Sequence, residues 1–113
     1  MKVSDILRVK GGTLFTITPE DSLIDAMKLM AERDMGSLVV MSTGRVVGML
    51  TFREVIRAIV KNGGTVGDAS VYRAMDAGPL TCTMATELDE VRRMMLERHA
   101  RYMPVMNQKM LWA

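Results

Sequence analysis

The chain has 113 residues, of which 49% are hydrophobic and 25% charged, values ordinary for a single globular domain. Its 15 basic and 13 acidic residues are mixed along the chain, so nothing in the charge pattern favours nucleic-acid binding. No stretch approaches the ~20 apolar residues that cross a bilayer, and one cysteine excludes an internal disulfide or a multi-cysteine zinc site. These features predict a cytoplasmic protein that does not enter a membrane.

The chain opens with a predicted helical turn at 4–9 and a short extended segment at 13–17. A helix follows, and Asp21 or Ser22 can cap it. Its apolar stripe repeats at the helical spacing i, i+3, i+4 and i+7. The stripe consists of Leu23, Ala26, Met27 and Met30. We expect Gly36 to end this helix.

A hairpin and a second helix complete the first half. Short apolar strands are predicted at 37–41 and 45–51, joined by the turn Ser42-Thr43-Gly44. The second helix is predicted at 52–60, directly after Thr51.

The second half repeats the first at an ungapped offset of 65 residues. The matching pairs are Arg8/Arg73, Thr16/Thr81, Thr18/Thr83, Leu23/Leu88, Met30/Met95, Glu32/Glu97, Arg33/Arg98, Val40/Val105 and Met41/Met106. We therefore expect Thr86 to cap a helix with the stripe Leu88, Val91 and Met95, followed by a strand at 102–106 and a turn at 107–109.

The repeat predicts the domain organisation. Repeat 1 spans 1–62, a linker spans 63–67 around Gly63-Gly64, and repeat 2 spans 68–113. Ala113 corresponds to Gly48, so repeat 2 lacks a counterpart to the end of the last strand and to the final helix. We expect a dimer partner to cover the surface this leaves, or the natural protein to continue beyond Ala113.

Two segments resemble the cystathionine β-synthase (CBS) domain family, whose members occur as tandem pairs. They are Gly48-Met49-Leu50-Thr51-Phe52-Arg53-Glu54 at a strand-to-helix junction and Tyr102-Met103-Pro104-Val105-Met106. The resemblance implies an α/β (α+β) fold of two pseudo-two-fold-related repeats, each a small three-stranded sheet on two helices. It also implies clefts between the repeats that bind adenosine compounds.

In the first cleft, the resemblance gives Thr51 a phosphate contact at a helix N-terminus, where an anion is favoured. Glu54 stands where the family has Asp on the ribose hydroxyls, and Met49 would touch the base. The remaining contacts would come from Arg53, Gly78, Leu80, Arg101 and Tyr102.

In the second, weaker cleft, Lys10, Phe15, Met35 and Gly36 match base-pocket positions. Each candidate also has a simpler structural interpretation. In that interpretation, Thr51 is a helix N-cap. Glu54 and Arg101 stabilise helix dipoles, and Tyr102 is a packing residue. His99 has no companions at metal-ligand spacing, and Cys82 is interpreted as a small core residue.

Two functions follow. The first is a regulatory module that binds AMP, ADP or ATP (S-adenosylmethionine or NAD less favoured), forms a homodimer and controls an enzyme or transporter. The second is a ligand-independent interaction or dimerisation module with degenerate clefts. No nucleophile is accompanied by a plausible base, so we predict no enzymatic activity, no required cofactor and no metal site.

Overall fold

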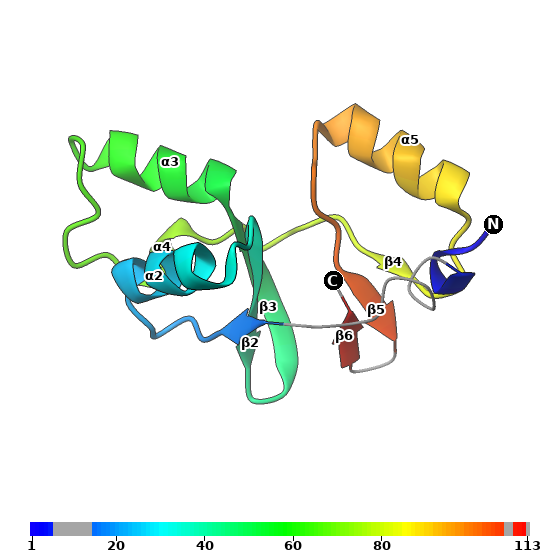
Figure 1. The fold of residues 1–113 in the computed structure, drawn as a ribbon, viewed down its shortest axis with the longest axis horizontal. Coiled ribbons are helices and arrows are strands. Elements are labelled where there is room, and N and C mark those ends of the chain that lie inside the picture. The colour runs from blue at the N-terminus through cyan, green and yellow to red at the C-terminus, as the bar shows by residue number, and fades with distance from the viewer. Residues whose placement is uncertain (6–14, 108–109, 113) are drawn as a thin grey trace. The chain divides into compact units, whose positions relative to one another are not determined.

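The computed structural model describes residues 1–5, 15–107 and 110–112. The chain forms two compact units (Figure 1). One is continuous and spans Phe15–Gly78; we call it the 15–78 unit. The other joins Met1–Leu14 to Pro79–Ala113, and we call it the 79–113 unit. Each unit is described by itself.

The 15–78 unit contains a three-stranded sheet of order β1-β2-β3, formed by β1 (Thr16–Ile17), β2 (Ser37–Ser42) and β3 (Arg45–Thr51). β1 pairs parallel to β2, and β2 pairs antiparallel to β3. Thr43 and Gly44 have φ angles of 50° and 77°. Two successive positive φ angles are typical of the tight turns whose twist matches a β-hairpin. The predicted hairpin is confirmed.

Three helices accompany this sheet: α2 (Leu23–Arg33), α3 (Phe52–Lys61) and α4 (Val71–Ala74). Ser22 is the N-cap of α2, and its hydroxyl accepts a hydrogen bond from the Asp25 amide at 3.1 Å. The prediction that Gly36 ends α2 is wrong. The helix ends at Arg33, because Asp34 adopts the left-handed conformation (φ 52°, ψ 50°), which Asp tolerates better than most residues.

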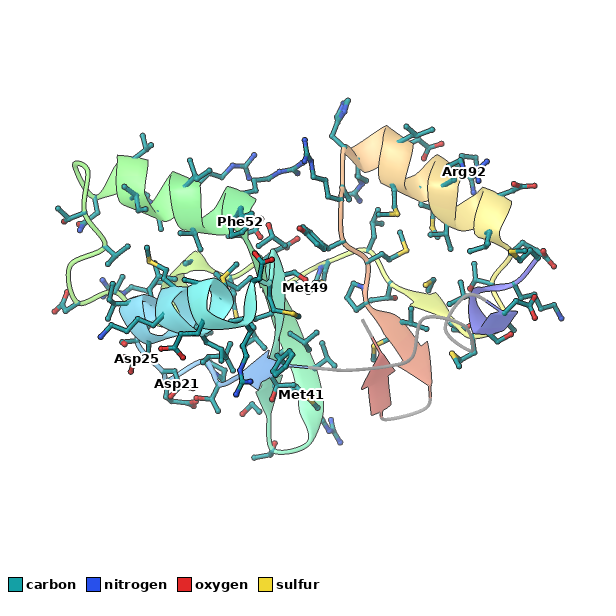
Figure 2. The ribbon with its side chains drawn as sticks, in the orientation of Figure 1. Asp21, Asp25, Met41, Met49, Phe52 and Arg92 are labelled. Atoms are coloured by element: carbon teal, nitrogen blue, oxygen red, sulfur yellow. The ribbon has the colours of Figure 1, made fainter. Side chains whose placement is uncertain are left out.

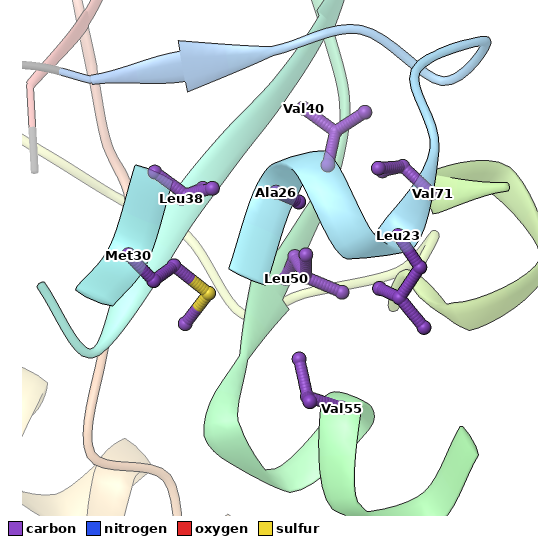
Figure 3. Packing of buried hydrophobic residues seen from close by; sticks show 8 residues of the cluster. All are labelled: Leu23, Ala26, Met30, Leu38, Val40, Leu50, Val55 and Val71. Atoms are coloured by element: carbon purple, nitrogen blue, oxygen red, sulfur yellow. The ribbon is translucent and has the colours of Figure 1, made fainter. Parts of the chain in front are cut away.

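The core of the 15–78 unit lies between its sheet and its helices (Figure 3). Leu23, Ala26 and Met30 of the predicted stripe are buried. They pack with side chains from β2, β3, α3 and α4, namely Leu38, Val40, Leu50, Val55 and Val71. α2 is therefore amphipathic in the way its spacing predicts.

The 79–113 unit has a second three-stranded sheet of order β4-β5-β6, formed by β4 (Cys82–Thr83), β5 (Val105–Asn107) and β6 (Met110–Trp112). The predicted strand at 102–106 begins later than expected, at Val105. Pro104 has no amide hydrogen to give to a sheet, but its carbonyl accepts from the Cys82 amide at 3.1 Å. β5 is the central strand, so Pro104 precedes a central strand rather than an edge.

The 79–113 unit contains the helix α5 (Leu88–Arg98). Its N-cap is Glu87, so the prediction that Thr86 caps it is wrong. The Thr86 hydroxyl instead accepts from the Thr83 amide at 2.9 Å and holds the turn before the helix. Leu88 and Val91 pack on the small core of Val3, Cys82 and Val105, together with Met94 rather than the expected Met95.

The two units match at many positions at the offset of 65 residues. α5 has the bounds of α2 moved by that offset, and the left-handed C-cap Asp34 returns as His99 (φ 53°). The strand pairs Ile17↔Val40 and Met41↔Val46 return as Cys82↔Val105 and Met106↔Leu111. The register differs at one pair, because Val40 faces Gly48, whereas Val105 faces Trp112, the equivalent of Val47. The sequence repeat is therefore in large part a repeat of strand register.

The offset changes at the segment that precedes each repeat's first strand. In the 15–78 unit, Ser70 pairs with Ser22 and the Val71 amide donates to the Asp21 carbonyl at 2.9 Å. In the 79–113 unit, Lys2 pairs with Glu87 in the same way, and the Val3 amide donates to the Thr86 carbonyl at 2.9 Å. These segments correspond at an offset of 68 residues. Arg8, which the offset of 65 matches with Arg73, lies outside the described residues.

The boundaries of the two compact units consequently differ from those of the sequence repeats at 1–62 and 68–113. Each repeat's leading segment packs in the other repeat's unit: residues 69–74 with the first repeat and residues 1–5 with the second. Residues 3–5 are helical, and the rest of the helical turn predicted at 4–9 lies outside the described residues. The mixed α and β fold class is confirmed, and no helix among the described residues is long and apolar enough to cross a membrane.

Candidate functional site

The junction between β3 and α3 holds four of the predicted site residues within the 15–78 unit. Met49 lies on β3 with only 2% of its surface exposed. Thr51 ends β3, and Phe52 begins α3 (Figure 2). Arg53 is exposed in the first turn of α3, whereas Glu54 is half-buried. The chain therefore passes in five residues from the core to a helix N-terminus, where amide hydrogens and the helix dipole favour an anion.

Thr51 and Glu54 form a capping box. The Thr51 hydroxyl oxygen accepts from the Arg53 amide at 3.2 Å. One carboxylate oxygen of Glu54, Oε1, accepts from the Thr51 amide at 2.8 Å and from the Thr51 hydroxyl at 2.5 Å. The structure thus places Thr51 in the N-cap role that was its alternative to a ligand contact, whereas Glu54, expected to act on the helix dipole, also folds back to the N-cap.

A close backbone approach brings Gly78 toward the same junction. Met49 and Asp76 exchange two backbone hydrogen bonds of 2.9 and 2.8 Å. A side chain on Gly48 would place its Cβ 2.7 Å from the Asp76 carbonyl oxygen, so any other residue there would force the backbone to shift. The Asp76 carboxylate in turn accepts from the Gly78 amide at 3.0 Å. Gly78 is therefore attached to β3 through Asp76.

Sequence reasoning missed Asp76, which connects these positions. Its type gave one signal, because Asp followed two residues later by Gly is a common way to close a turn with a side-chain oxygen. The pairing of its backbone with Met49 had no sequence signal, since it joins residues far apart in the chain.

Three predicted contacts of the first cleft belong to the 79–113 unit. Leu80 is half-buried, Arg101 is exposed and Tyr102 is 38% exposed. They lie in the segments before β4 and before β5, at positions without regular secondary structure. Their part in a ligand site stays a prediction.

The second predicted set lies partly in the 15–78 unit. Lys10 lies outside the described residues, whereas Phe15, Met35 and Gly36 are half-buried. The Arg33 guanidinium lies 5.4 Å from the centre of the Phe15 ring, a cation–π contact that occupies one face of that ring. The Gly36 carbonyl accepts from the Phe52 amide at 3.3 Å, so Gly36 adjoins the start of α3.

The titratable and metal-binding groups that the structure describes add no further candidate site. Cys82 is buried, and its burial raises the pKa of the thiol above the usual value, which keeps it protonated at neutral pH. Among the described residues, no group of three or more His, Cys, Asp or Glu side chains could hold a metal ion.

The largely repeated strand register shows two similar small units of mixed α and β structure, and the first of them contains the junction Gly48–Glu54. The family model of the CBS domain matches residues 3–61. The chain belongs to the CBS domain family, as its resemblance indicates.

Known relatives agree with this assignment. The chain is 28% identical over 116 residues to the Arabidopsis thaliana "CBS domain-containing protein CBSX3, mitochondrial", covering 95% of this chain and 56% of that protein. It is 31% identical over 105 residues to an uncharacterised 17.7 kDa protein of Acidianus ambivalens, covering 92% of this chain and 60% of that one. The chain therefore spans little more than half the length of these relatives.

Solved structures match the whole fold. A CBS-domain-containing protein of Agrobacterium tumefaciens superposes with a TM-score of 0.92 at 26% identity, covering 100% of this chain and 90% of that one. An uncharacterised conserved protein of Pyrococcus horikoshii gives 0.81 at 32% identity, with coverage of 95% and 82%.

Proposed function

We propose that this chain is a regulatory module that binds an adenosine nucleotide, with Thr51 at the N-terminus of α3 contacting the phosphate. The observation that carries the proposal is the β3–α3 junction, where Met49, Thr51 and Gly78 lie within one unit of a CBS domain protein. Catalysis has no part in the proposal.

A related structure supports the choice of ligand. The protein CBSX2 has been solved in complex with AMP, and its fold matches this chain with a TM-score of 0.77 at 24% identity. We therefore favour AMP, followed by ADP and ATP, over S-adenosylmethionine and NAD. Leu80, Arg101, Tyr102 and the exposed Arg53 stay predicted contacts for the base and the phosphate.

The test is a thermal-shift panel with these five compounds, followed by titration of any ligand that binds. A ligand at about 100 times its dissociation constant adds ~2.7 kcal/mol to the free energy of unfolding, which is a clear shift. We expect Thr51→Ala to weaken binding roughly tenfold or more, since a hydrogen bond to a charged group contributes about 1.5–3 kcal/mol.

Thr51→Ala also removes a helix cap, so it needs a matched control. Ser22→Ala removes the cap of α2 in the same unit and costs a similar ~1 kcal/mol of stability. It should leave the dissociation constant unchanged. Equal loss of binding in both variants would mean that Thr51 acts only through stability, and no shift with any compound would contradict nucleotide binding.

A second function rests on a different observation, the exposed apolar stripe of α3. Phe52, Ile56 and Val60 follow one another at i, i+4 and i+8 and are 54%, 59% and 72% exposed. Such a stripe on a helix is typical of an interaction surface. We propose that it contacts a second copy of the chain, and that dimerisation can proceed without a nucleotide. A structural relative from bloom-forming cyanobacteria is a hexamer, at 21% identity.

Sedimentation equilibrium tests the dimer. Ile56→Asp should shift the chain toward monomer, because a carboxylate cannot be buried in an apolar interface without a partner. Arg45→Asp adds the same group at the exposed start of β3 and should have no effect. A wild-type monomer at all concentrations would contradict dimerisation.

The partner and compartment are proposals of the same kind. We propose that the module regulates an enzyme or transporter and acts in the cytoplasm. A pull-down with nucleotide present and absent tests the first point, and fractionation of tagged protein tests the second.

A further inference from the structure

We infer that Glu54 competes with the nucleotide phosphate for Thr51, so that phosphate binding requires the capping box of α3 to open. This inference rests on the proposed function. It assigns Glu54 a different role from the ribose contact that the family resemblance implies, and makes it a positioning residue that weakens binding.

The first argument is the use of the Thr51 hydroxyl. A threonine hydroxyl has a single proton to donate. In this structure that proton points to Glu54 Oε1, and the hydroxyl oxygen accepts from the Arg53 amide. A phosphate oxygen can only accept hydrogen bonds, so Thr51 must release Glu54 before it can donate to a phosphate.

The second argument is charge. The carboxylate of Glu54 accepts from the Thr51 amide and lies in the first turn of α3. That is where the helix dipole stabilises an anion, and one anion already occupies the position. A phosphate arriving at Thr51 would meet a like charge within hydrogen-bonding distance of the same hydroxyl, which disfavours it.

Side-chain length explains why Glu54 reaches this position. Glu or Gln at the third helical residue can fold back to the amide of the N-cap, which is the defining contact of a capping box. Gln at position 54 can therefore keep the contact with the Thr51 amide while it removes the negative charge.

The experiment compares Glu54→Gln with wild type by calorimetric titration of AMP and of adenosine, which lacks the phosphate. We expect Glu54→Gln to bind AMP about threefold to tenfold more tightly, because a hydrogen bond to a neutral amide oxygen is weaker than one to a carboxylate and the like charge is gone. Binding of adenosine should be unchanged. Glu32→Gln removes the same charge from an exposed site on α2 and should leave AMP affinity as in wild type. Circular dichroism of each variant checks that α3 is intact.

The outcomes separate this inference from the proposed function. If wild type binds AMP and Glu54→Gln binds it with equal or lower affinity, the competition is overturned and the proposed nucleotide site stands. An equal gain for AMP and adenosine overturns it as well, because the phosphate would not be involved. Binding by Glu54→Gln alone supports the competition, whereas no binding by any variant overturns both.

Discussion

At the scale of single residues, Gly48 shows how tightly the junction is built. Its Cα lies beside the backbone of Asp76, and a Cβ there would also lie 3.0 Å from the Met75 sulfur. We expect Gly48→Ala to destabilise the chain by about 1–3 kcal/mol, because the obstructing atom is a backbone carbonyl that must move. Urea unfolding measures this loss.

The control for this substitution is Gly78→Ala. No atom lies within 4 Å of the Cβ that would be added at Gly78. The same change there should leave stability within about 0.5 kcal/mol or raise it slightly, since alanine restricts the unfolded chain. If Gly48→Ala were as stable as Gly78→Ala, the segment at Met75–Asp76 could not be held against β3 as described.

At the scale of elements, the left-handed end of α2 predicts an unusual gain in stability. Asp34 places a carboxylate at the negative end of a helix dipole and adopts a positive φ, and both are unfavourable for Asp. We expect Asp34→Gly to raise the free energy of unfolding by roughly 0.5–1 kcal/mol. Glu32→Gly, two residues earlier inside the helix, should lower it by about 1 kcal/mol. A loss of stability in both variants would contradict the assigned C-cap.

The elements also show what the sequence could predict and what it could not. The hairpin turn at Thr43–Gly44 and the stripe of α2 carry strong local signals in the sequence, and the structure confirms both predictions. The end of α2 was misplaced because Gly36 is the better helix terminator by composition, although Asp34 takes the left-handed conformation. The cap of α5 was misplaced because Thr86 has a good capping side chain, which the preceding turn uses instead.

The candidate site was predictable only in part, for a physical reason. The types and order of residues at Gly48–Glu54 identify a strand entering a helix N-terminus. The sequence does not determine which of several possible donors and acceptors these residues pair with. The capping box between Thr51 and Glu54 is one of those possible pairings. Asp76 lies far along the chain from Met49, and no local pattern predicts their pairing.

At the scale of the whole molecule, each repeat's leading segment packs in the other repeat's unit. A destabilising substitution in one leading segment should therefore loosen the other repeat. Val3 is 5% exposed in the core of the 79–113 unit, and Val71 is fully buried in that of the 15–78 unit. Val3→Ala and Val71→Ala should each cost roughly 2 kcal/mol, since each removes two buried methyl groups.

Hydrogen exchange with peptide-level resolution locates these losses. Val3→Ala should speed exchange in α5, which is distant in sequence, and Val71→Ala should speed it in α2. Faster exchange in α2 for Val3→Ala, with α5 unchanged, would contradict the assignment of residues 1–5 to the 79–113 unit.

The packing of each leading segment in the other repeat's unit also sets an order of events during synthesis. Residues 1–4 leave the ribosome long before the residues whose carbonyls and amides they bond to, because those partners belong to residues 84–88. The 15–78 unit can close as soon as its own residues have emerged, because all of them are continuous in the chain. Residues 1–4 can therefore pack only after residues 84–88 have been made, and until then Val3 lacks the core that buries it. Contacts between residues so far apart in the chain are also slow to form.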